Sequence, residues 1–512
     1  MASRILGLVR EQIIAALFGA GAATDAYNVA FRIPNLVRDL FAEGAMSAAF
    51  VPTFTRYLST AGKPSAWRLG NHVINALVLL TGILALVGIV FAEPIVTALA
   101  AESFTTDPAK LALTVQLARV MVPSLVFIAV AAALMGMLNS LQHFFVPAAS
   151  PAMFNVVSIG CMLGLAPAMP ALGFNPVMAI AVGTLLGAAA QAALQWPTLR
   201  REGFRYRPTL DVRDEGLRRV LVLMGPGTLG LAATQVNVFV NTLLATSQVE
   251  GAVSWLNYAF RLMYLPIGLF GVSIATAVLP AMSRHLVAHD VPASRKTVAD
   301  GLSLMMMMNI PATVGLMVLA VPIVRLIFER GAFEPAHTLG TAAALRYYAI
   351  GLVGYSIVRI ASPTFYALDE SRTPVKVSMA TVLVNAALNI ALVRVMGYQG
   401  LALGTSMAAM VNAGALLFLL RRRLHGLEER RVLTSLAKIG VASLLMGAAA
   451  HGAHVWLHSV LPGDALVAQL TRLGASIAAA LGVLAAAAHV LRIEEFRDGV
   501  RVVASRVMRR RP

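Results

Sequence analysis

The chain has 512 residues, of which 58% are hydrophobic and only 13% are charged, whereas a soluble domain averages about 25% charged residues. This composition excludes a soluble globular protein, and the single cysteine, Cys161, excludes a disulfide framework and a thiolate metal site. The net charge of +17 would suit a nucleic-acid-binding protein, but the distribution of the basic residues described below argues against that class.

Apolar stretches recur along nearly the whole chain, and each is long enough to cross a bilayer, which takes about 20 residues. They predict an all-α polytopic membrane protein with about fourteen transmembrane helices and no soluble domain. The expected helices cover residues 3–20, 26–54, 71–92, 111–138, 147–168, 175–198, 219–245, 252–280, 302–328, 341–367, 374–394, 399–420, 433–457 and 466–490.

The first two expected helices contain eight charged residues. These are Arg4, Arg10, Glu11, Asp25, Arg32, Arg38, Asp39 and Glu43. A charge at the centre of a membrane helix costs about 2.5–3.5 kcal/mol on insertion scales, so these side chains are expected to face something polar. Asp25, Arg32 and Asp39 repeat every seven residues and therefore share one helical face. We predict a water-filled cavity that receives a charged or strongly polar substrate.

The arginines in this group indicate a phosphate-containing substrate. A guanidinium donates bidentate hydrogen bonds to phosphate and stays ionised. The structural alternative is that acids and arginines neutralise one another between packed helices, but a purely structural pair could be replaced by apolar packing. Arg261 is the lone cation of the eighth expected helix, with no acid nearby in sequence, which makes it a strong ligand candidate. Arg119, Arg346 and Arg359 either extend to the interface or lie between lobes.

An internal repeat relates residues 27–41, YNVAFRIPNLVRDLF, to residues 256–270, LNYAFRLMYLPIGLF. Chance similarity of apolar helices is the alternative, but co-aligned arginines and a proline argue against it. The repeat predicts an N-terminal lobe (helices 1–6), a C-terminal lobe (helices 7–12), two added helices and a basic cytoplasmic tail. Their ranges are 1–199, 219–421, 433–490 and 491–512. Because six helices per repeat is an even number, both lobes insert in the same orientation around a central cavity, as in transporters that work by alternating access.

The basic residues concentrate in alternate loops. With the N-terminus in the cytoplasm, 27 of the 41 lysines and arginines fall in cytoplasmic segments, three fall on the opposite side, and the rest lie within spans. This bias is the positive-inside rule, which predicts that both termini are cytoplasmic. It also accounts for the positive charge without nucleic acid.

The sequence contains no pattern typical of an enzyme site. It lacks a phosphate-binding GxxxxGK[ST] loop and a nucleophile motif, and its histidines have no metal-ligand spacing. We therefore expect no metal and no cofactor. A membrane enzyme that acts on polyprenols would need a catalytic acid pair or a loop metal site.

Gly183 and Gly187 form a GxxxG pattern, which favours close helix packing.

Residues 3–52 include the string FGAGAATDAY, followed by FRIPNLVRDLFAEGA, and resemble the N-terminal part of the MurJ (MviN) family. The resemblance continues through LNSLQHFFVPAASPAMFN, MGPGTLG, VSWLNYAFRL and SPTFYALDESRTPVKV, and so covers essentially the whole chain. The family comprises bacterial lipid II flippases of the multidrug/oligosaccharidyl-lipid/polysaccharide exporter superfamily. A related polysaccharide-lipid or multidrug exporter is the alternative, but it should lack the N-terminal string.

The resemblance implies fourteen helices, two six-helix lobes and a V-shaped cavity. It implies a transporter of the bacterial inner membrane that flips lipid II for cell-wall synthesis, with membrane lipids around it and contacts with the cell-wall synthesis machinery. The pyrophosphate of lipid II would account for the arginines, and helices 13 and 14 would hold its lipid tail. The family usually begins with an upstream stretch, so we expect the chain to be clipped at its N-terminus.

Residue by residue, the resemblance implies a substrate-binding set. It consists of Arg4, Arg10, Arg38, Arg261, Asp25 and Glu43. Further candidates for the cavity or its gating are Ser3, Glu11, Arg32, Asp39 and Ser254. The chain departs from the family at Glu11, where Asp is frequent, and at Phe260 and Tyr264, which replace acids near Arg261.

Some family members hold sodium in the C-terminal lobe with carboxylates and a hydroxyl. The matching positions here are Asn241, Asn385, Asn389 and Thr405, which supply no anion. Neutral amides bind a hard monovalent cation more weakly than carboxylates. We therefore expect a vestigial cation pocket, and transport that follows membrane potential or protons without sodium.

Overall fold

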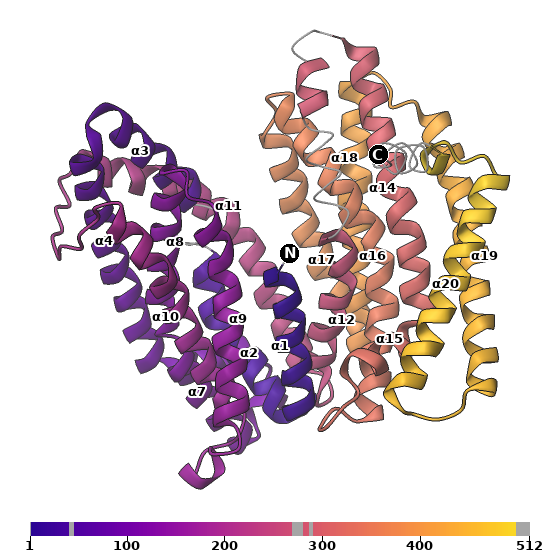
Figure 1. The fold of residues 1–512 in the computed structure, drawn as a ribbon, viewed down its shortest axis with the longest axis horizontal. Coiled ribbons are helices and arrows are strands. Elements are labelled where there is room, and N and C mark those ends of the chain that lie inside the picture. Colours follow the sequence, from indigo (N-terminus) through magenta and orange to yellow (C-terminus); the bar gives the residue numbers. More distant parts are fainter. Residues whose placement is uncertain (1, 40–45, 269–279, 286–289, 498–512) are drawn as a thin grey trace, which may run out of the picture. The chain divides into compact units, whose positions relative to one another are not determined.

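The computed structural model of this chain describes residues 2–39, 46–268, 280–285 and 290–497 (Figure 1). Within these ranges the regular elements are helices, and no β-strand occurs. Nine helical segments of the described part are long and apolar enough to cross a membrane. The predicted all-α polytopic class is therefore confirmed, while the exact number of fourteen spans stays a prediction.

The chain divides into two compact units. The first consists of Met1–Ser254 with Arg330–Glu334, and the second of Trp255–Glu329 with Pro335–Pro512. Figure 1 draws most of the first unit in indigo to magenta and most of the second in orange to yellow. The lobes predicted from the repeat, 1–199 and 219–421, stay predictions.

The helices described in the first unit enclose two apolar clusters, one around Phe50, Phe54 and Met137 and the other around Tyr27 and Met121. These helices are α1 (Ala2–Phe18), α2 (Ala22–Arg38), α3 (Met46–Thr60), α4 (Gly62–Val90), α5 (Ala92–Leu99), α6 (Glu102–Thr105), α7 (Pro108–Met121), α8 (Ser124–Ser140), α9 (Phe145–Leu165), α10 (Met178–Arg201) and α11 (Glu215–Thr246). A short 3₁₀ turn, Pro170–Leu172, joins α9 to α10.

The second unit contains most of α12 and the helices that follow. They are α12 (Ala252–Pro266), α14 (Val291–Val318), α15 (Ala320–Phe328), α16 (Pro335–Ala367), α17 (Arg372–Met396), α18 (Tyr398–Arg423), α19 (Glu429–Val460) and α20 (Leu466–Val490). Its core includes Met305, Met306 and Met307, which belong to the methionine run of α14, and Phe365 of α16.

Aspartates cap several of these helices. Asp107, Asp214 and Asp290 precede α7, α11 and α14, and each carboxylate accepts a hydrogen bond from a backbone N–H of the first turn. Such a cap satisfies one of the donors that a helix start leaves without an intrahelical partner. The sequence thus determines these helix starts locally.

Two of the expected helices are each divided in the structure. The segment 111–138 is split between α7 and α8 at Val122 and Pro123, where the proline has no N–H to continue the hydrogen-bond ladder. The segment 302–328 is split between α14 and α15 at Leu319. The prediction of unbroken helices is wrong here because both halves are apolar, so hydropathy does not register the break.

The expected helix 26–54 includes α2 and the first part of α3, and its middle, residues 40–45, lies outside the described residues. The segment 55–70, which lies between two of the expected helices, is also helical except near Ala61. Hydropathy marks where the apolar surface ends, whereas a helix can continue beyond that point because its backbone hydrogen bonds are internal.

The GxxxG pattern lies where α10 packs against α9. A Cβ on Gly183 would lie 3.1 Å from the carbonyl oxygen of Ser158, and one on Gly187 would lie 2.9 Å from that of Phe154. Only glycine allows this approach of the two backbones. The predicted close packing is therefore confirmed.

Candidate functional site

Arg10 and Glu11 form a buried pair on α1. Nη2 of Arg10 donates to Oε1 of Glu11 at 3.0 Å, and the guanidinium lies over the ring of Phe154 on α9, 5.4 Å from its centroid. Nε of Arg10 is buried and has no hydrogen-bond partner among the described residues. The guanidinium is therefore held in place with part of its hydrogen-bonding capacity unused.

A cavity of about 350 Å³ lies beside this pair, within the first unit. Arg10 of α1 and Arg38 of α2 both line it, although they are 28 positions apart in the sequence. Ser3, Asn35 and Asn155 add polar groups to its wall. The structure thus brings together two of the predicted substrate-binding arginines and one of the predicted cavity residues.

Arg38 differs from Arg10 in its exposure. Its Nε and Nη2 donate to Oδ1 of the neighbouring Asp39 at 3.2 and 3.0 Å, and both side chains remain about one-third exposed. A solvated pair of this kind contributes little to stability. The side chain of Arg38 is therefore partly accessible, unlike that of Arg10.

Asp25 is not among the residues that line the cavity and instead contacts the start of α12. Its side chain is buried, with 2% exposure, and its carboxylate accepts hydrogen bonds from the backbone N–H of Gly251, at 2.7 Å, and from the N–H and hydroxyl of Ser254, at 2.9 and 2.6 Å. Asn28 donates to the same hydroxyl at 3.0 Å. Since α12 begins at Ala252, Asp25 acts as an N-cap supplied by another helix.

Three more charged residues near the N-terminus were predicted to bind substrate or to line the cavity. Arg4 is exposed and Arg32 is half-buried, and neither lines the cavity. Glu43 lies outside the described residues. Their predicted contacts with substrate, and that of Asp25, stay predictions.

In the second unit, Arg261 is half-buried on α12. The positions where the family often has acids carry Phe260 and Tyr264, whose rings pack against Tyr355 of α16 with centroids 6.4 and 6.3 Å apart. Nη2 of Arg359 donates to the hydroxyl of Tyr264 at 2.9 Å. Sequence reasoning missed this aromatic group, although the four-residue spacing of Phe260 and Tyr264 predicts one shared helical face.

Two of the four residues predicted for a cation pocket lie together. Nδ2 of Asn389 donates to Oδ1 of Asn385 at 3.1 Å, and both residues of α17 are almost fully buried. Gly404 of α18 leaves the room that the Asn389 side chain occupies. Thr405 is half-buried on α18, whereas Asn241 belongs to the first unit. Among the described residues no group of three His, Cys, Asp or Glu side chains could hold a metal ion.

Comparison with known proteins gives consistent matches along the chain. Residues 14–470 match the model of the family described as Lipid II flippase MurJ. A probable lipid II flippase MurJ of Vibrio cholerae serotype O1 is 36% identical over 463 residues, which covers 89% of this chain and 86% of the relative. The lipid II flippase MurJ of Burkholderia cenocepacia is 35% identical, covering 82% and 81%.

Solved structures agree with these matches. A lipid II flippase MurJ in an inward closed conformation has a TM-score of 0.77 at 27% identity and covers 96% of this chain and 97% of its own. An inward-facing multidrug resistance transporter of the MATE family has a TM-score of 0.69, with coverage of 83% and 96%. At 17% identity the second likeness concerns the fold alone.

Proposed function

Because the chain belongs to the lipid II flippase MurJ family, we propose that it moves lipid II across the bacterial inner membrane for cell-wall synthesis. The match along residues 14–470 carries this proposal. The substrate would be an undecaprenyl pyrophosphate bearing a disaccharide pentapeptide. The protein would expose its binding site alternately to the two sides of the membrane, and it would act as a transporter with no chemical step.

The pyrophosphate would bind at the cavity of the first unit. Arg10 is fixed by Glu11 and Phe154, so its guanidinium is preorganised. Arg38 is accessible and can place its planar fork on a phosphate. We assign Asp25 to the support of this site, since its carboxylate joins α2 to the start of α12. Arg261 of α12 stays a separate candidate for substrate binding.

Other parts of the chain would bind the lipid tail, and the chain would have one orientation in the membrane. Helices α19 and α20 would form the groove for the tail, and both termini would lie in the cytoplasm. A related exporter of another lipid-linked polysaccharide would have the same fold, but the family match favours lipid II.

The test is depletion of the cell's own flippase with rescue by this chain, scored as lipid II exposed on the periplasmic face. Arg38→Ala and Arg261→Ala should abolish rescue, because a hydrogen bond to a charged group contributes about 1.5–3 kcal/mol. Arg→Lys at either position should rescue only partly, since a point charge replaces a bidentate fork.

Arg201→Ala provides a matched control, since Arg201 is an exposed cation at the end of α10. It should rescue fully, and all variants should reach the membrane in equal amounts. Full rescue by both Arg38→Ala and Arg261→Ala would contradict the assignment of these arginines to the substrate. Failure of the unchanged chain to restore lipid II exposure would contradict the proposed function itself.

A further inference from the structure

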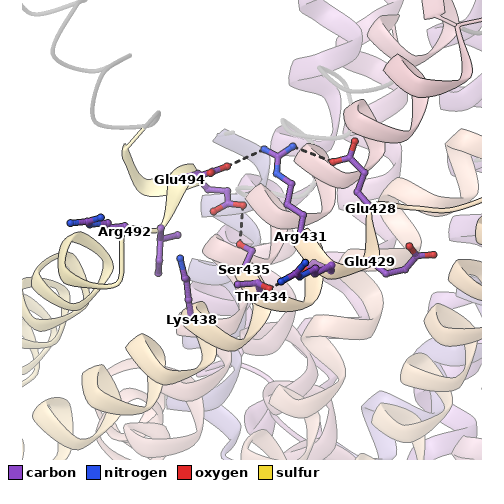
Figure 2. A pocket seen from close by; sticks show the side chains of 11 residues that line it. Glu428, Glu429, Arg431, Thr434, Ser435, Lys438, Arg492 and Glu494 are labelled. Carbon is purple, nitrogen blue, oxygen red and sulfur yellow. Dashed lines mark hydrogen bonds and ion pairs between the residues drawn. The ribbon is translucent and has the colours of Figure 1, made fainter.

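The two ends of the helix pair α19 and α20 differ in charge. At one end, the first turns of α19 and the segment after α20 line a pocket with equal numbers of glutamates and basic side chains (Figure 2). Arg431 there contacts Glu494 at 3.2 Å and Glu428 at 3.3 Å. At the other end, the described residues that line a smaller pocket include two arginines and no acid. The smaller pocket is therefore the candidate for a negatively charged ligand.

We call this smaller cavity the α15–α20 pocket, and all of its described lining belongs to the second unit. Its volume is about 70 Å³, whereas the cavity of the first unit has about 350 Å³. A water molecule occupies about 30 Å³ in the liquid, so the α15–α20 pocket has room only for a small ligand. Its polar lining consists of Arg325 of α15, His454 and His458 of α19, and Gln469 and Arg472 of α20.

Arg472 is a buried cation whose described partners are neutral. Its side chain is only 3% exposed and lies in the second turn of α20, which begins at Leu466. Nη2 donates to the carbonyl of Gly463 at 2.7 Å, and Nη1 donates to Nδ1 of His458. A guanidinium has only donors, so Nδ1 of His458 accepts this bond and the imidazole is neutral. The described residues thus bond to Arg472 without supplying a counter-charge.

Two polar atoms of the lining residues are buried and have no hydrogen-bond partner in the described part of the chain. They are Nε of Arg472 and Nδ1 of His454. The Nε–H of arginine is always a donor, and Nδ1 of histidine is a donor in the tautomer that carries its proton there. Arg472, His458 and Arg325 all lie within electrostatic range of the His454 imidazole. A ligand that accepts hydrogen bonds would satisfy both atoms.

The other charged groups near the pocket leave one positive charge without compensation. Arg325 contacts Glu329 at 3.2 Å, and the hydroxyl of Thr338 donates to the same carboxylate at 2.5 Å. Asp464, the acid nearest to Arg472 in the sequence, is exposed and does not line the pocket. The charge of Arg472 therefore remains. A buried charge needs a partner of opposite sign, so a singly charged anion fits better than a dianion such as hydrogen phosphate.

A metal ion is a poor alternative occupant. Histidine is a common metal ligand, but the described residues offer no group of three His, Cys, Asp or Glu side chains that could hold a metal. The two arginines of the lining would also repel a cation. The chemistry of the pocket thus favours an anion.

We propose that the α15–α20 pocket binds one small monovalent anion, such as chloride, which accepts hydrogen bonds from Nε of Arg472 and from the imidazole of His454. The anion would supply the negative charge that the pocket lining lacks, and it would join α15, α19 and α20. The proposal does not rest on lipid II transport, because its tests measure binding and unfolding.

The first test follows thermal unfolding of the full chain in detergent while chloride replaces gluconate at constant ionic strength. Gluconate is too large for a cavity of about 70 Å³. The midpoint should rise with chloride along a saturating curve, because a ligand that binds only the folded state stabilises it. Equal midpoints at every chloride concentration would mean that the pocket holds water only, and would overturn the proposal.

The variant R472M removes the charge and keeps an unbranched side chain, so its folding needs no counter-charge. Its dissociation constant for chloride should rise roughly tenfold or more, since charge-assisted hydrogen bonds are the strong ones. In gluconate alone it should unfold at the same temperature as the unchanged chain or higher, because the uncompensated charge is gone. An equal loss of stability in both salts would instead assign Arg472 to its bonds with Gly463 and His458 alone.

Two matched pairs separate this site from general effects of salt. H454L should weaken chloride binding roughly threefold, the effect of one hydrogen bond, whereas H451L changes an exposed histidine one turn earlier and should leave the binding unchanged. R394M removes an exposed cation from the last turn of α17 and should respond to chloride as the unchanged chain does. A loss of the response in R394M equal to that in R472M would overturn the proposal.

The second test locates the ion directly. Crystals of the full chain grown with bromide in place of chloride should show a peak of anomalous scattering within hydrogen-bond distance of Nε of Arg472. The same peak should be absent in crystals of R472M. Bromide found at exposed positions and not in the pocket would mean an adventitious ion only, and would contradict the assignment.

Discussion

Arg10 and Arg38 line one cavity, yet the protein holds them in different ways. Arg10 is buried against Glu11 and Phe154, whereas Arg38 is about one-third exposed and paired with Asp39. A buried charge is stable only while its partner is present, because the desolvation cost otherwise stays uncompensated. The two arginines therefore differ in what their loss would do to the fold and to transport.

Glu11→Ala should lower the free energy of unfolding by about 3–5 kcal/mol, because it leaves the buried Arg10 without its carboxylate. Replacing both residues, as Arg10→Met with Glu11→Leu, should restore most of that stability through apolar packing. Thermal unfolding in detergent measures both effects.

A rescue experiment distinguishes a role of Arg10 and Glu11 in transport from a role in packing alone. The double variant should remain unable to rescue cells depleted of their own flippase, although it folds and reaches the membrane. Rescue by this stable double variant would mean that Arg10 and Glu11 serve packing alone.

At the scale of elements, the start of α12 depends on a residue from α2. Asp25 and Ser254 are separated by 229 positions, the same offset that relates Arg32 to Arg261 in the repeat. This contact therefore joins α2 to the start of α12, the two helices that the predicted repeat relates. Sequence comparison places Asp25 and Ser254 in equivalent positions but does not predict that they are bonded.

Asp25→Asn should destabilise the protein by about 1–3 kcal/mol, because the amide cannot accept hydrogen bonds at both positions and leaves a buried donor unsatisfied. The expected observation is a lower midpoint of thermal unfolding. Asp39→Asn is the matched control, since Asp39 is partly exposed, and it should change the midpoint little. An unchanged midpoint in Asp25→Asn would rule out the capping role.

At the scale of the whole molecule, the distribution of basic residues predicts the orientation in the membrane. Reporter fusions at Gly203 and at Pro512 should be active only with a reporter that works in the cytoplasm, because both segments are rich in arginine. A periplasmic signal at either position would contradict the helix count or the orientation.

Energy coupling is a second property of the whole molecule. Asn385 and Asn389 offer neutral amides where a sodium site would need an anion. We expect flipping in proteoliposomes to continue when choline replaces sodium at a fixed membrane potential. It should respond to the potential, at about 2.3 kcal/mol per charge per 100 mV. A large loss of activity on removing sodium would disprove this expectation.

The sequence alone determined the class of this protein and the family to which it belongs. Apolar stretches of bilayer length, the intramembrane arginines and the N-terminal string are local features, and local features can be recognised without knowing which helices touch. The aspartate caps of α7, α11 and α14 are local in the same sense.

Only the tertiary structure decided which of these residues act together. It placed Arg10 and Arg38 on one cavity, bonded Asp25 to the start of α12, and joined α19 to the segment after α20 in a charged pocket. These contacts link positions far apart in the chain. They depend on how whole helices pack against one another, and the period of a single helix contains no information about its neighbours.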